Sequence, residues 1–189
     1  MKRLAVYCGS SFGSSARFAA RARYLGERMA ARGIDLVYGG GHRGLMGVVA
    51  DAVLAGGGKA YGVIPKALVD LEVAHTGLTE LYVVSTMHER KALMTELTDA
   101  FVAIPGGVGT LDELFEAWSW NALGYHAKPF ALLNEDGFWN ELLAFLDTAT
   151  ASGFISGSRR AQLLVAASPD EAFDQLAQAC GCAEAKMVW

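Results

Sequence analysis

Residues 101–114 read FVAIPGGVGTLDEL and join a short apolar segment to a helix through a glycine-rich turn. The apolar segment predicts a buried strand, and the stripe formed by Leu111, Leu114 and Trp118 predicts the helix. Three glycines in four positions let the backbone approach a ligand closely. A helix that starts there also points unpaired N–H groups and the positive end of its dipole at the same spot. The turn is therefore predicted to form an anion pocket.

Two interpretations of this turn are open. Thr110 and Glu113 have the spacing of a capping box, in which both side chains only satisfy free backbone donors. A capping box does not require Pro105, Gly106 and Gly107 ahead of it, which favours a ligand site. A carboxylate on the wall of an anion pocket is poorly suited to holding the anion but well suited to chemistry beside it.

Short apolar runs alternate with longer amphipathic stretches along the whole chain. Strands are expected at residues 2–8, 34–38, 59–64, 80–84, 101–104, 130–133 and 163–165, and helices at 15–32, 44–54, 87–99, 110–123, 138–150 and 169–179. The strands are too apolar for one face to meet water, and crossover helices must return over the sheet. We expect an α/β fold with a doubly wound, Rossmann-like parallel sheet and helices on both faces. A single domain is expected over residues 1–180, followed by a C-terminal tail at 181–189.

Composition narrows the classes of function. The chain has 189 residues, 52% of them apolar, which is enough for one domain with a large core. A net charge of −4 with both signs scattered argues against nucleic acid as a partner. There is no signal-peptide pattern and no run near the ~18 apolar residues of a membrane span, so a soluble protein without a membrane partner is expected. Three cysteines without a CxxC pair support neither disulfides nor zinc, and predict a cytoplasmic location.

The glycine-rich turns all follow predicted strands, at residues 8–11, 39–41 and 105–107. In an open parallel sheet such loops lie at the same edge, where the winding reverses and ligands bind, so a nucleotide-sized pocket is expected there. Residues 39–44 also satisfy GxGxxG, but the third strand ends in Ile64-Pro65 rather than in an acid that could hold a ribose diol. NAD is therefore discounted, and so is a P-loop, because no Lys-Ser or Lys-Thr pair closes the glycine run.

A second unusual segment, MHERK at residues 87–91, opens a predicted helix. Arg90 shares a helical stripe with Leu93, and Lys91 shares one with Met94, so neither cation lies on a plainly solvated face. Both are expected to be drawn partly inward. The alternative is that their stems cover apolar surface while the charged groups reach water.

Together, MHERK and the stretch DAFVAIPGGVGTLDE at residues 99–113 resemble the Lonely Guy family of cytokinin-activating phosphoribohydrolases. The signature of that family is PGGxGTxxE preceded by an Arg-Lys pair. The resemblance also covers VYCGSS at 6–11, LVYGGGHRGLMG at 36–47, GVIPKAL at 62–68, EVAH at 72–75, KPFALLN at 128–134 and GFI at 153–155. The last twenty or so residues fall outside it.

The resemblance implies that the chain hydrolyses a nucleoside 5′-monophosphate, either AMP or an N6-substituted AMP, as a homodimer without a cofactor or a metal. It implies a catalytic pair, Arg90 and Glu113. Plant members of the family carry threonine where this chain has Ser119, so the hydroxyl of that contact is kept. Substrate contacts are expected at Glu72, Arg90, Lys91, Gly107, Val108, Gly109, Thr110, Leu111, Asp112, Glu113 and Ser119, and the glycine turns add Gly106, Ser10, Gly40 and Gly41.

The residues also suggest a chemistry of their own. A substrate phosphate on the amides of residues 107–110 places the ribose beside Glu113. Cleavage of the bond from C1′ to the base passes through an oxocarbenium-like ribosyl cation. Glu113 could stabilise this cation, orient the ribose hydroxyls or accept a proton from water. Arg90 stays protonated, so it is expected to orient Glu113 or to neutralise charge on the phosphate or the departing base. Lys91 is expected to add a second cation toward the phosphate.

Two other classes of function are compatible with the same turns. A nucleotide or molybdenum-cofactor carrier would use them for binding alone. A lysine decarboxylase, the name often given to PGGxGTxxE proteins, needs a Schiff-base lysine and a partner for the pyridinium nitrogen of pyridoxal phosphate, and no such pair is recognisable. His75, His88 and His126 lack the spacing of metal ligands and are expected to be structural.

Overall fold

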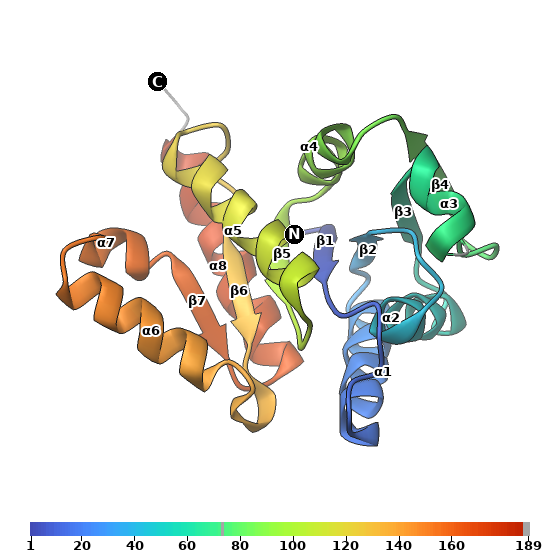
Figure 1. The fold of residues 1–189 in the computed structure, drawn as a ribbon, viewed down its shortest axis with the longest axis horizontal. Helices are drawn as coiled ribbons and strands as arrows, with labels where there is room; N and C mark the ends of the chain where they lie inside the picture. Colours follow the sequence, from blue (N-terminus) through green and yellow to red (C-terminus); the bar gives the residue numbers. More distant parts are fainter. Residues whose placement is uncertain (73, 187–189) are drawn as a thin grey trace.

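The computed structural model describes residues 1–72 and 74–186, with side chains at residues 1–69 and 74–181. Seven strands form one sheet (Figure 1): β1 Arg3–Tyr7, β2 Asp35–Tyr38, β3 Ala60–Pro65, β4 Glu80–Val84, β5 Ala100–Ala103, β6 Phe130–Leu133 and β7 Leu163–Ala166. The helices are α1 Ala16–Ala31, α2 Gly44–Ala55, α3 Lys66–Glu72, α4 Met87–Leu97, α5 Val108–Ala122, a 3-10 turn Glu135–Gly137, α6 Asn140–Ala151, α7 Gly157–Arg160 and α8 Pro169–Lys186.

The order of the strands indicates where on the sheet a ligand is expected to bind. It runs β4-β3-β2-β1-β5-β6-β7, and every pair is parallel. The chain winds outward from β1 to β4, then returns to pair β5 with the other side of β1. Tyr7 and Ala103 lie opposite each other at the carboxyl ends of β1 and β5. Ligands of open α/β sheets bind beyond the strand ends at such a reversal.

Both faces of the sheet are covered by helices. Along β5 the side chain of Val102 packs into a core with α1, α2 and α8, whereas that of Phe101 packs into a second core with α4, α5 and α6. Both side chains are 0% exposed. Because neither face meets water, the central strands are apolar throughout, without the alternation of a half-exposed sheet. The predicted doubly wound, Rossmann-like α/β fold is confirmed.

The predicted element boundaries need three corrections. Helix α5 begins at Val108 rather than at Thr110, and its N-cap is Gly107, which makes no side-chain cap. The capping-box interpretation is therefore wrong, because Thr110 and Glu113 both lie inside the helix. Two short helices, α3 and α7, were not predicted because neither is long enough to show helical periodicity. Helix α8 continues to residue 186, into the segment expected as a tail.

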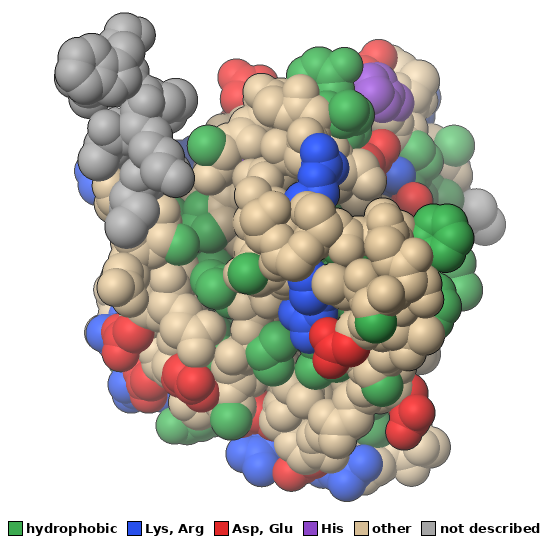
Figure 2. Space-filling model, turned by 90° about the vertical axis from the view of Figure 1, so that its left-hand side faces the viewer, with side chains coloured by type: hydrophobic (Ala, Val, Ile, Leu, Met, Phe, Trp, Pro, Cys, Tyr) green, Lys and Arg blue, Asp and Glu red, His purple; other side chains and the backbone are tan. Residues whose placement is uncertain are grey.

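On the face shown in Figure 2, no large area carries charges of only one sign. Acidic and basic side chains are interspersed among apolar ones. One such pairing ties α1 to α8: Arg28 Nε and Nη2 donate to the two carboxylate oxygens of Asp170 at 3.1 and 2.9 Å. In the part of the chain that the structure describes, no helix combines the length and the apolar character that crossing a bilayer requires.

Candidate active site

The glycine-rich loops after β1, β2 and β5 meet at one edge of the sheet. The amide of Gly9 donates to the carbonyl of Pro105 at 3.1 Å, and the Gly9 carbonyl accepts from the amide of Leu45 at 3.0 Å. Gly44 has a φ of +62°, and a Cβ on it would overlap the backbone of Ser10. Only glycine allows this approach, so the small residues serve to bring three loops together beyond the switch between β1 and β5.

The start of α5 presents a row of unpaired amides. The first amide to bond back along the helix is that of Leu111, which donates to the Gly107 carbonyl at 3.1 Å. The amides of residues 107–110 precede it and belong to the part of a helix that has no internal acceptor. The side chain of Val108 is 85% exposed, and no atom stands within 4 Å of a Cβ built on Gly107 or Gly109. This open N-terminus is suited to binding an anion.

Gly106 and Thr110 fix the shape of the same turn. Thr110 is 3% exposed, and its hydroxyl lies where a Cβ of residue 106 would be. A side chain at position 106 would also come within 2.9 Å of the Gly9 amide. Gly106 is therefore required for packing the turn, whereas Gly107 and Gly109 leave space beside the unpaired amides.

Helix α4 delivers the two cations of the MHERK segment. Its N-cap, Thr86, accepts a hydrogen bond from the Glu89 amide at 3.1 Å, and the Glu89 carboxylate accepts from the Ser85 amide at 2.7 Å. This reciprocal capping, of the kind first considered for Thr110, fixes where α4 begins. Arg90 follows within the first turns and points toward the sheet, where it is 7% exposed.

Arg90 and Glu113 form an ion pair at the centre of the site. Arg90 Nη2 lies 3.0 Å from Glu113 Oε1, and the two side chains are only 9% and 11% exposed. Arg90 Nε also donates to the carbonyl of Val63 in β3 at 3.1 Å, and its guanidinium lies against the α-carbon of Gly39. The guanidinium thus contacts the loop after β2, strand β3 and helix α5 at the carboxyl edge of the sheet.

Glu113 lies on the same helical stripe as Gly109, one turn further along α5. The rise between them is about 6 Å, and helical side chains lean toward the N-terminus, so the carboxylate leans toward the unpaired amides. An anion bound at these amides would therefore have the Arg90–Glu113 pair beside it.

Lys91 bonds to the two carboxylates that flank Glu113 on α5. Its Nζ lies 2.8 Å from Asp112 Oδ2 and 2.9 Å from Glu116 Oε2, with the lysine side chain 16% exposed. Burial acts to lower the pKa of Lys91, but the hydrogen bonds to both carboxylates outweigh it and raise the pKa overall. The expectation that both cations of MHERK turn inward is confirmed.

The charge of Glu113 affects the pKa of two side chains near the carboxyl end of β1, Tyr7 and Cys8. Burial raises the pKa of Tyr7 far above its usual value, and the negative charge of Glu113 acts in the same direction. Burial and the same carboxylate raise the pKa of the Cys8 thiol. Tyr7 stacks on Phe101 with ring centroids 5.8 Å apart. Both side chains stay neutral, so Cys8 is an unreactive thiol.

The structure separates the expected substrate contacts into groups. The residues gathered around the start of α5 are Arg90, Lys91, Gly106, Gly107, Val108, Gly109, Thr110, Asp112 and Glu113. Leu111 packs at the margin of the core beneath α5. The side chain of Glu72 lies outside the described residues.

The remaining candidates lie on the loops that follow β1 and β2. Ser10 lines a separate hollow of about 420 Å³ together with His42, Arg43 and Asp51. Gly40 has a φ of +75° and is buried, and its carbonyl accepts from the His75 amide at 3.1 Å. Gly41 forms a bridge with residue 74.

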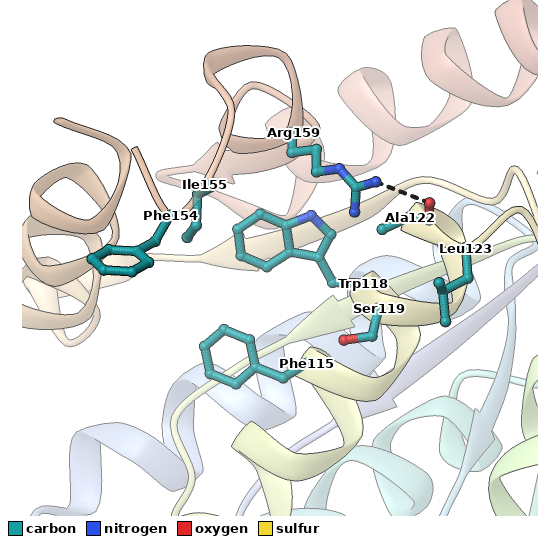
Figure 3. Close-up of a pocket in the computed structure, with 8 residues that line it drawn as sticks. All are labelled: Phe115, Trp118, Ser119, Ala122, Leu123, Phe154, Ile155 and Arg159. Carbon is teal, nitrogen blue, oxygen red and sulfur yellow. Dashed lines mark hydrogen bonds between the residues drawn. The ribbon is translucent and has the colours of Figure 1, made fainter. Parts of the chain in front are cut away.

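Ser119 points away from the ion pair. It follows Glu113 by six residues, which turns it roughly 240° around the helix. It lies in an aromatic hollow of about 450 Å³ between α5 and the segment before α7, where Trp118 faces Ile155 and the guanidinium of Arg159 donates to the Ala122 carbonyl at 3.2 Å (Figure 3).

Sequence reasoning missed three participants: Gly39, Val63 and Tyr7. Gly39 belongs to a conspicuous run of glycines in the sequence. Its role, however, depends on its contact with the side chain of Arg90, which lies on another crossover helix. Val63 contributes only a carbonyl, which no sequence pattern marks. Tyr7 carries a polar hydroxyl at the buried carboxyl end of β1, and this was the available signal.

The histidines have local partners. His75 Nε2 lies 2.9 Å from Asp51 Oδ1 while its Nδ1 accepts from the Gly77 amide at 3.0 Å, and His126 Nδ1 accepts from the Lys128 amide at 3.2 Å. Across the described side chains, no group of three or more His, Cys, Asp or Glu residues is arranged to hold a metal ion.

The whole chain is similar to proteins of known name. The family described as "Possible lysine decarboxylase" matches residues 46–176. A cytokinin riboside 5′-monophosphate phosphoribohydrolase of Oryza sativa subsp. japonica is 46% identical over 188 residues, covering 100% of this chain and 78% of the relative. Another protein of that name, from Arabidopsis thaliana, is 44% identical over 191 residues, covering 100% of this chain and 89% of the relative.

Solved structures share the fold at lower identity. The molybdenum cofactor binding protein from Rippkaea orientalis superposes with a TM-score of 0.70 at 22% identity, covering 93% of this chain and 95% of the other. The Moco carrier protein from Chlamydomonas reinhardtii superposes with a TM-score of 0.71 at 21% identity, covering 95% and 98%. These likenesses establish the architecture.

Proposed function

Because the chain belongs to the family of cytokinin riboside 5′-monophosphate phosphoribohydrolases, we propose that it hydrolyses the N-glycosidic bond of AMP or an N6-substituted AMP. The products are the free base and ribose 5-phosphate. The observation that carries the proposal is the Arg90–Glu113 ion pair, one helical turn from the open amides that begin α5.

The substrate phosphate binds at the start of α5, on the amides of residues 107–110. These donors need no side chain, and the helix dipole adds favourable potential for an anion. With the phosphate there, the 5′ carbon and the ribose extend along α5 toward Glu113. The rise of about 6 Å over the four residues from Gly109 to Glu113 suits the distance from a phosphate to the sugar ring.

Glu113 provides the negative charge that the reaction requires. As the bond from C1′ to the base breaks, the base departs with the bonding electrons and takes up a proton. Water adds a hydroxyl group to C1′ and releases one proton, which balances the proton taken up by the base, and the sugar becomes ribose 5-phosphate. Positive charge grows on C1′ and the ring oxygen, and a fixed carboxylate beside them stabilises that charge.

Arg90 holds the carboxylate in place. A guanidinium stays protonated in proteins, so it does not donate the proton that the base needs. Arg90 bonds to both the Val63 carbonyl and Glu113, and this fixes one carboxylate oxygen of Glu113. The ion pair therefore has its orientation before substrate binds. Such preorganisation lowers the reorganisation cost of reaching the transition state.

A direct assay tests the proposal. Purified protein is incubated with AMP and with isopentenyl-AMP, and released base and ribose 5-phosphate are quantified by chromatography. We expect both products in equal amounts from at least one nucleotide. If neither nucleotide yields ribose 5-phosphate, the proposed hydrolase activity is wrong.

Glu113→Gln separates a hydrolase from a nucleotide or molybdenum-cofactor carrier. The amide keeps the shape of the side chain but not its charge. We expect turnover to fall by about a thousandfold while AMP binding, measured by calorimetry, changes by about threefold or less. A carrier would bind AMP without turnover in the wild type as well as in the variant.

The family description also names lysine decarboxylation, which uses pyridoxal phosphate held by a lysine amine. A Schiff-base lysine must lose its proton, whereas Lys91 carries a raised pKa between two carboxylates. Burial lowers the pKa of Lys128, but this lysine precedes β6 at the opposite edge of the sheet from the α5 amides. These residues do not fit the cofactor. An absorbance scan of purified protein that revealed bound pyridoxal would contradict this assignment.

A homodimer is part of the same proposal. Its support is a set of exposed apolar side chains near the end of α5 and the start of α7: Leu123, Tyr125 and Phe154 are 70%, 76% and 88% exposed. Light scattering is expected to give twice the chain mass of 20.1 kDa, and Tyr125→Glu with Phe154→Glu to give the single mass. The cytoplasmic location stays a prediction from the cysteine content.

A further inference from the structure

The segment that follows α3 is attached to two other elements near the carboxyl edge of the sheet. Ala74 forms an antiparallel bridge with Gly41, and the amide of His75 donates to the Gly40 carbonyl at 3.1 Å. These contacts join the segment to the glycine run after β2. The imidazole of His75 reaches α2, where its Nε2 lies 2.9 Å from Asp51 Oδ1. One residue thus holds the segment through both its backbone and its side chain.

The hydrogen bonds of His75 determine where its ring carries the proton. Nδ1 accepts from the Gly77 amide at 3.0 Å, so this nitrogen has no hydrogen of its own. The N–H of the ring is therefore at Nε2, and it donates to Asp51. The side chain is 9% exposed, and the ring of His42 stands edge-on to it with centroids 5.9 Å apart. Both ring nitrogens are used in fixing the orientation of the imidazole.

The same segment begins beside a residue with an expected role. Helix α3 has seven residues and ends at Glu72, the acid that family resemblance places on the substrate. So short a helix gains little stability from its own hydrogen bonds, and its position depends on tertiary contacts. The contacts of Ala74 and His75 come two and three residues after Glu72. They are therefore well placed to decide where this end of α3 lies.

We infer that His75 is a positioning residue for Glu72, because its bonds to Asp51 and Gly77 hold the segment after α3 against α2 and the glycine run. The inference rests on the proposed function and deepens it, since it assigns His75 a part in nucleotide binding. His75 acts through Glu72 and does not itself contact the substrate.

The Arg90–Glu113 ion pair is anchored independently of His75. Its guanidinium is held by the Val63 carbonyl in β3 and by the carboxylate on α5. Loss of the bond between His75 and Asp51 leaves these contacts in place. The expected consequence is weaker binding of the nucleotide, with turnover at saturating substrate retained.

AMP binding, measured by calorimetry, and steady-state kinetics test the inference. His75→Ala removes both ring bonds, Asp51→Leu removes the acceptor for Nε2, and Asp51→Asn keeps an oxygen that can accept there. We expect the first two variants to raise the Kd of AMP by about tenfold or more, with kcat within about threefold of wild type. Asp51→Asn should keep the Kd within about threefold of wild type.

Asp147→Leu is the matched control. Asp147 is paired with Arg160 at 2.8 Å in the same way as Asp51 is paired with His75 at 2.9 Å, and the two aspartate side chains are 64% and 61% exposed. It lies in α6, away from the glycine turns, so its variant should leave the Kd of AMP unchanged.

A double variant tests whether His75 acts through Glu72. Glu72→Ala should raise the Kd of AMP, and adding His75→Ala should then raise it by no more than about twofold, because the positioned group is already absent. The inference is overturned if the two losses multiply, or if Glu72→Ala leaves the Kd unchanged.

A purely structural role of His75 gives a different result. In that case His75→Ala lowers the unfolding temperature but keeps the Kd of AMP at its wild-type value below the unfolding transition, which overturns the inference. If the wild type binds AMP but hydrolyses neither AMP nor isopentenyl-AMP, the proposed function fails and these affinities still assign His75. If the wild type does not bind AMP, both proposals fall.

Discussion

The guanidinium of Arg90 lies so close to the α-carbon of Gly39 that no side chain fits between them. Residue 39 directly follows β2, and Arg90 lies in the first turn of α4, after two further strands. Alanine at this position would therefore require the guanidinium to move, and the contact links part of the GGG sequence to the Arg90–Glu113 ion pair.

Gly39→Ala should therefore act through Arg90. The added methyl group forces the guanidinium away from Glu113 and from the Val63 carbonyl, and we expect kcat/KM for AMP to fall by about a hundredfold. Gly157→Ala, where a Cβ meets no atom within 4 Å, is the control and should keep full activity. Wild-type kinetics in Gly39→Ala would contradict the proposed restraint on Arg90.

The Arg90–Glu113 pair predicts a non-additive effect on stability. Both side chains are nearly buried, so Arg90→Met leaves the Glu113 carboxylate without its counter-ion and should reduce the free energy of unfolding by about 3 kcal/mol. Adding Glu113→Gln removes the stranded charge and should restore part of that loss. Urea denaturation of the two single variants, the double variant and the wild type measures the coupling. Additive losses would mean that the two charges do not interact.

The N-cap of α4 predicts a link between helix stability and activity. Thr86→Ala removes the acceptor for the Glu89 amide and should cost about 1 kcal/mol in the free energy of unfolding. Because Arg90 lies in the turn that this cap stabilises, kcat should fall as well. Ser156→Ala removes the corresponding cap of α7, away from the site, and should leave kcat unchanged. Equal kcat values in the two variants would rule out the link.

His126 predicts how stability depends on pH. Burial lowers its pKa, and the charge of Lys128 acts in the same direction. The unfolded chain, with a histidine pKa of about 6.5, therefore takes up this proton first as the pH falls. The free energy of unfolding should decline below about pH 6.5 and recover as the pH rises, because the unfolded state binds more protons in that window.

His126→Gln removes this contribution, so urea denaturation should show a smaller loss of stability between about pH 7.5 and pH 5.5 than in the wild type. His88→Gln, at an exposed position in α4, should retain the wild-type slope. Identical pH slopes for His126→Gln and the wild type would contradict the expectation.

The secondary structure followed from local pattern because the strands are buried on both faces. A run such as residues 100–103 has no polar position, and the long helices between such runs carry clear apolar stripes. The start of α5 was misplaced because Thr110 and Glu113 match a capping box by spacing alone. In the folded chain Thr110 is buried against Gly106, and Gly107 is the N-cap instead.

The sequence by itself determined the parallel α/β fold, the location of the glycine turns after β1, β2 and β5, and the residue types gathered there. Only the tertiary structure decided which cation pairs with which acid, and that Lys91 is tied to Asp112 and Glu116. The physical reason is that elements form from neighbours in the chain, whereas these side chains meet only after two crossovers return over the same face of the sheet.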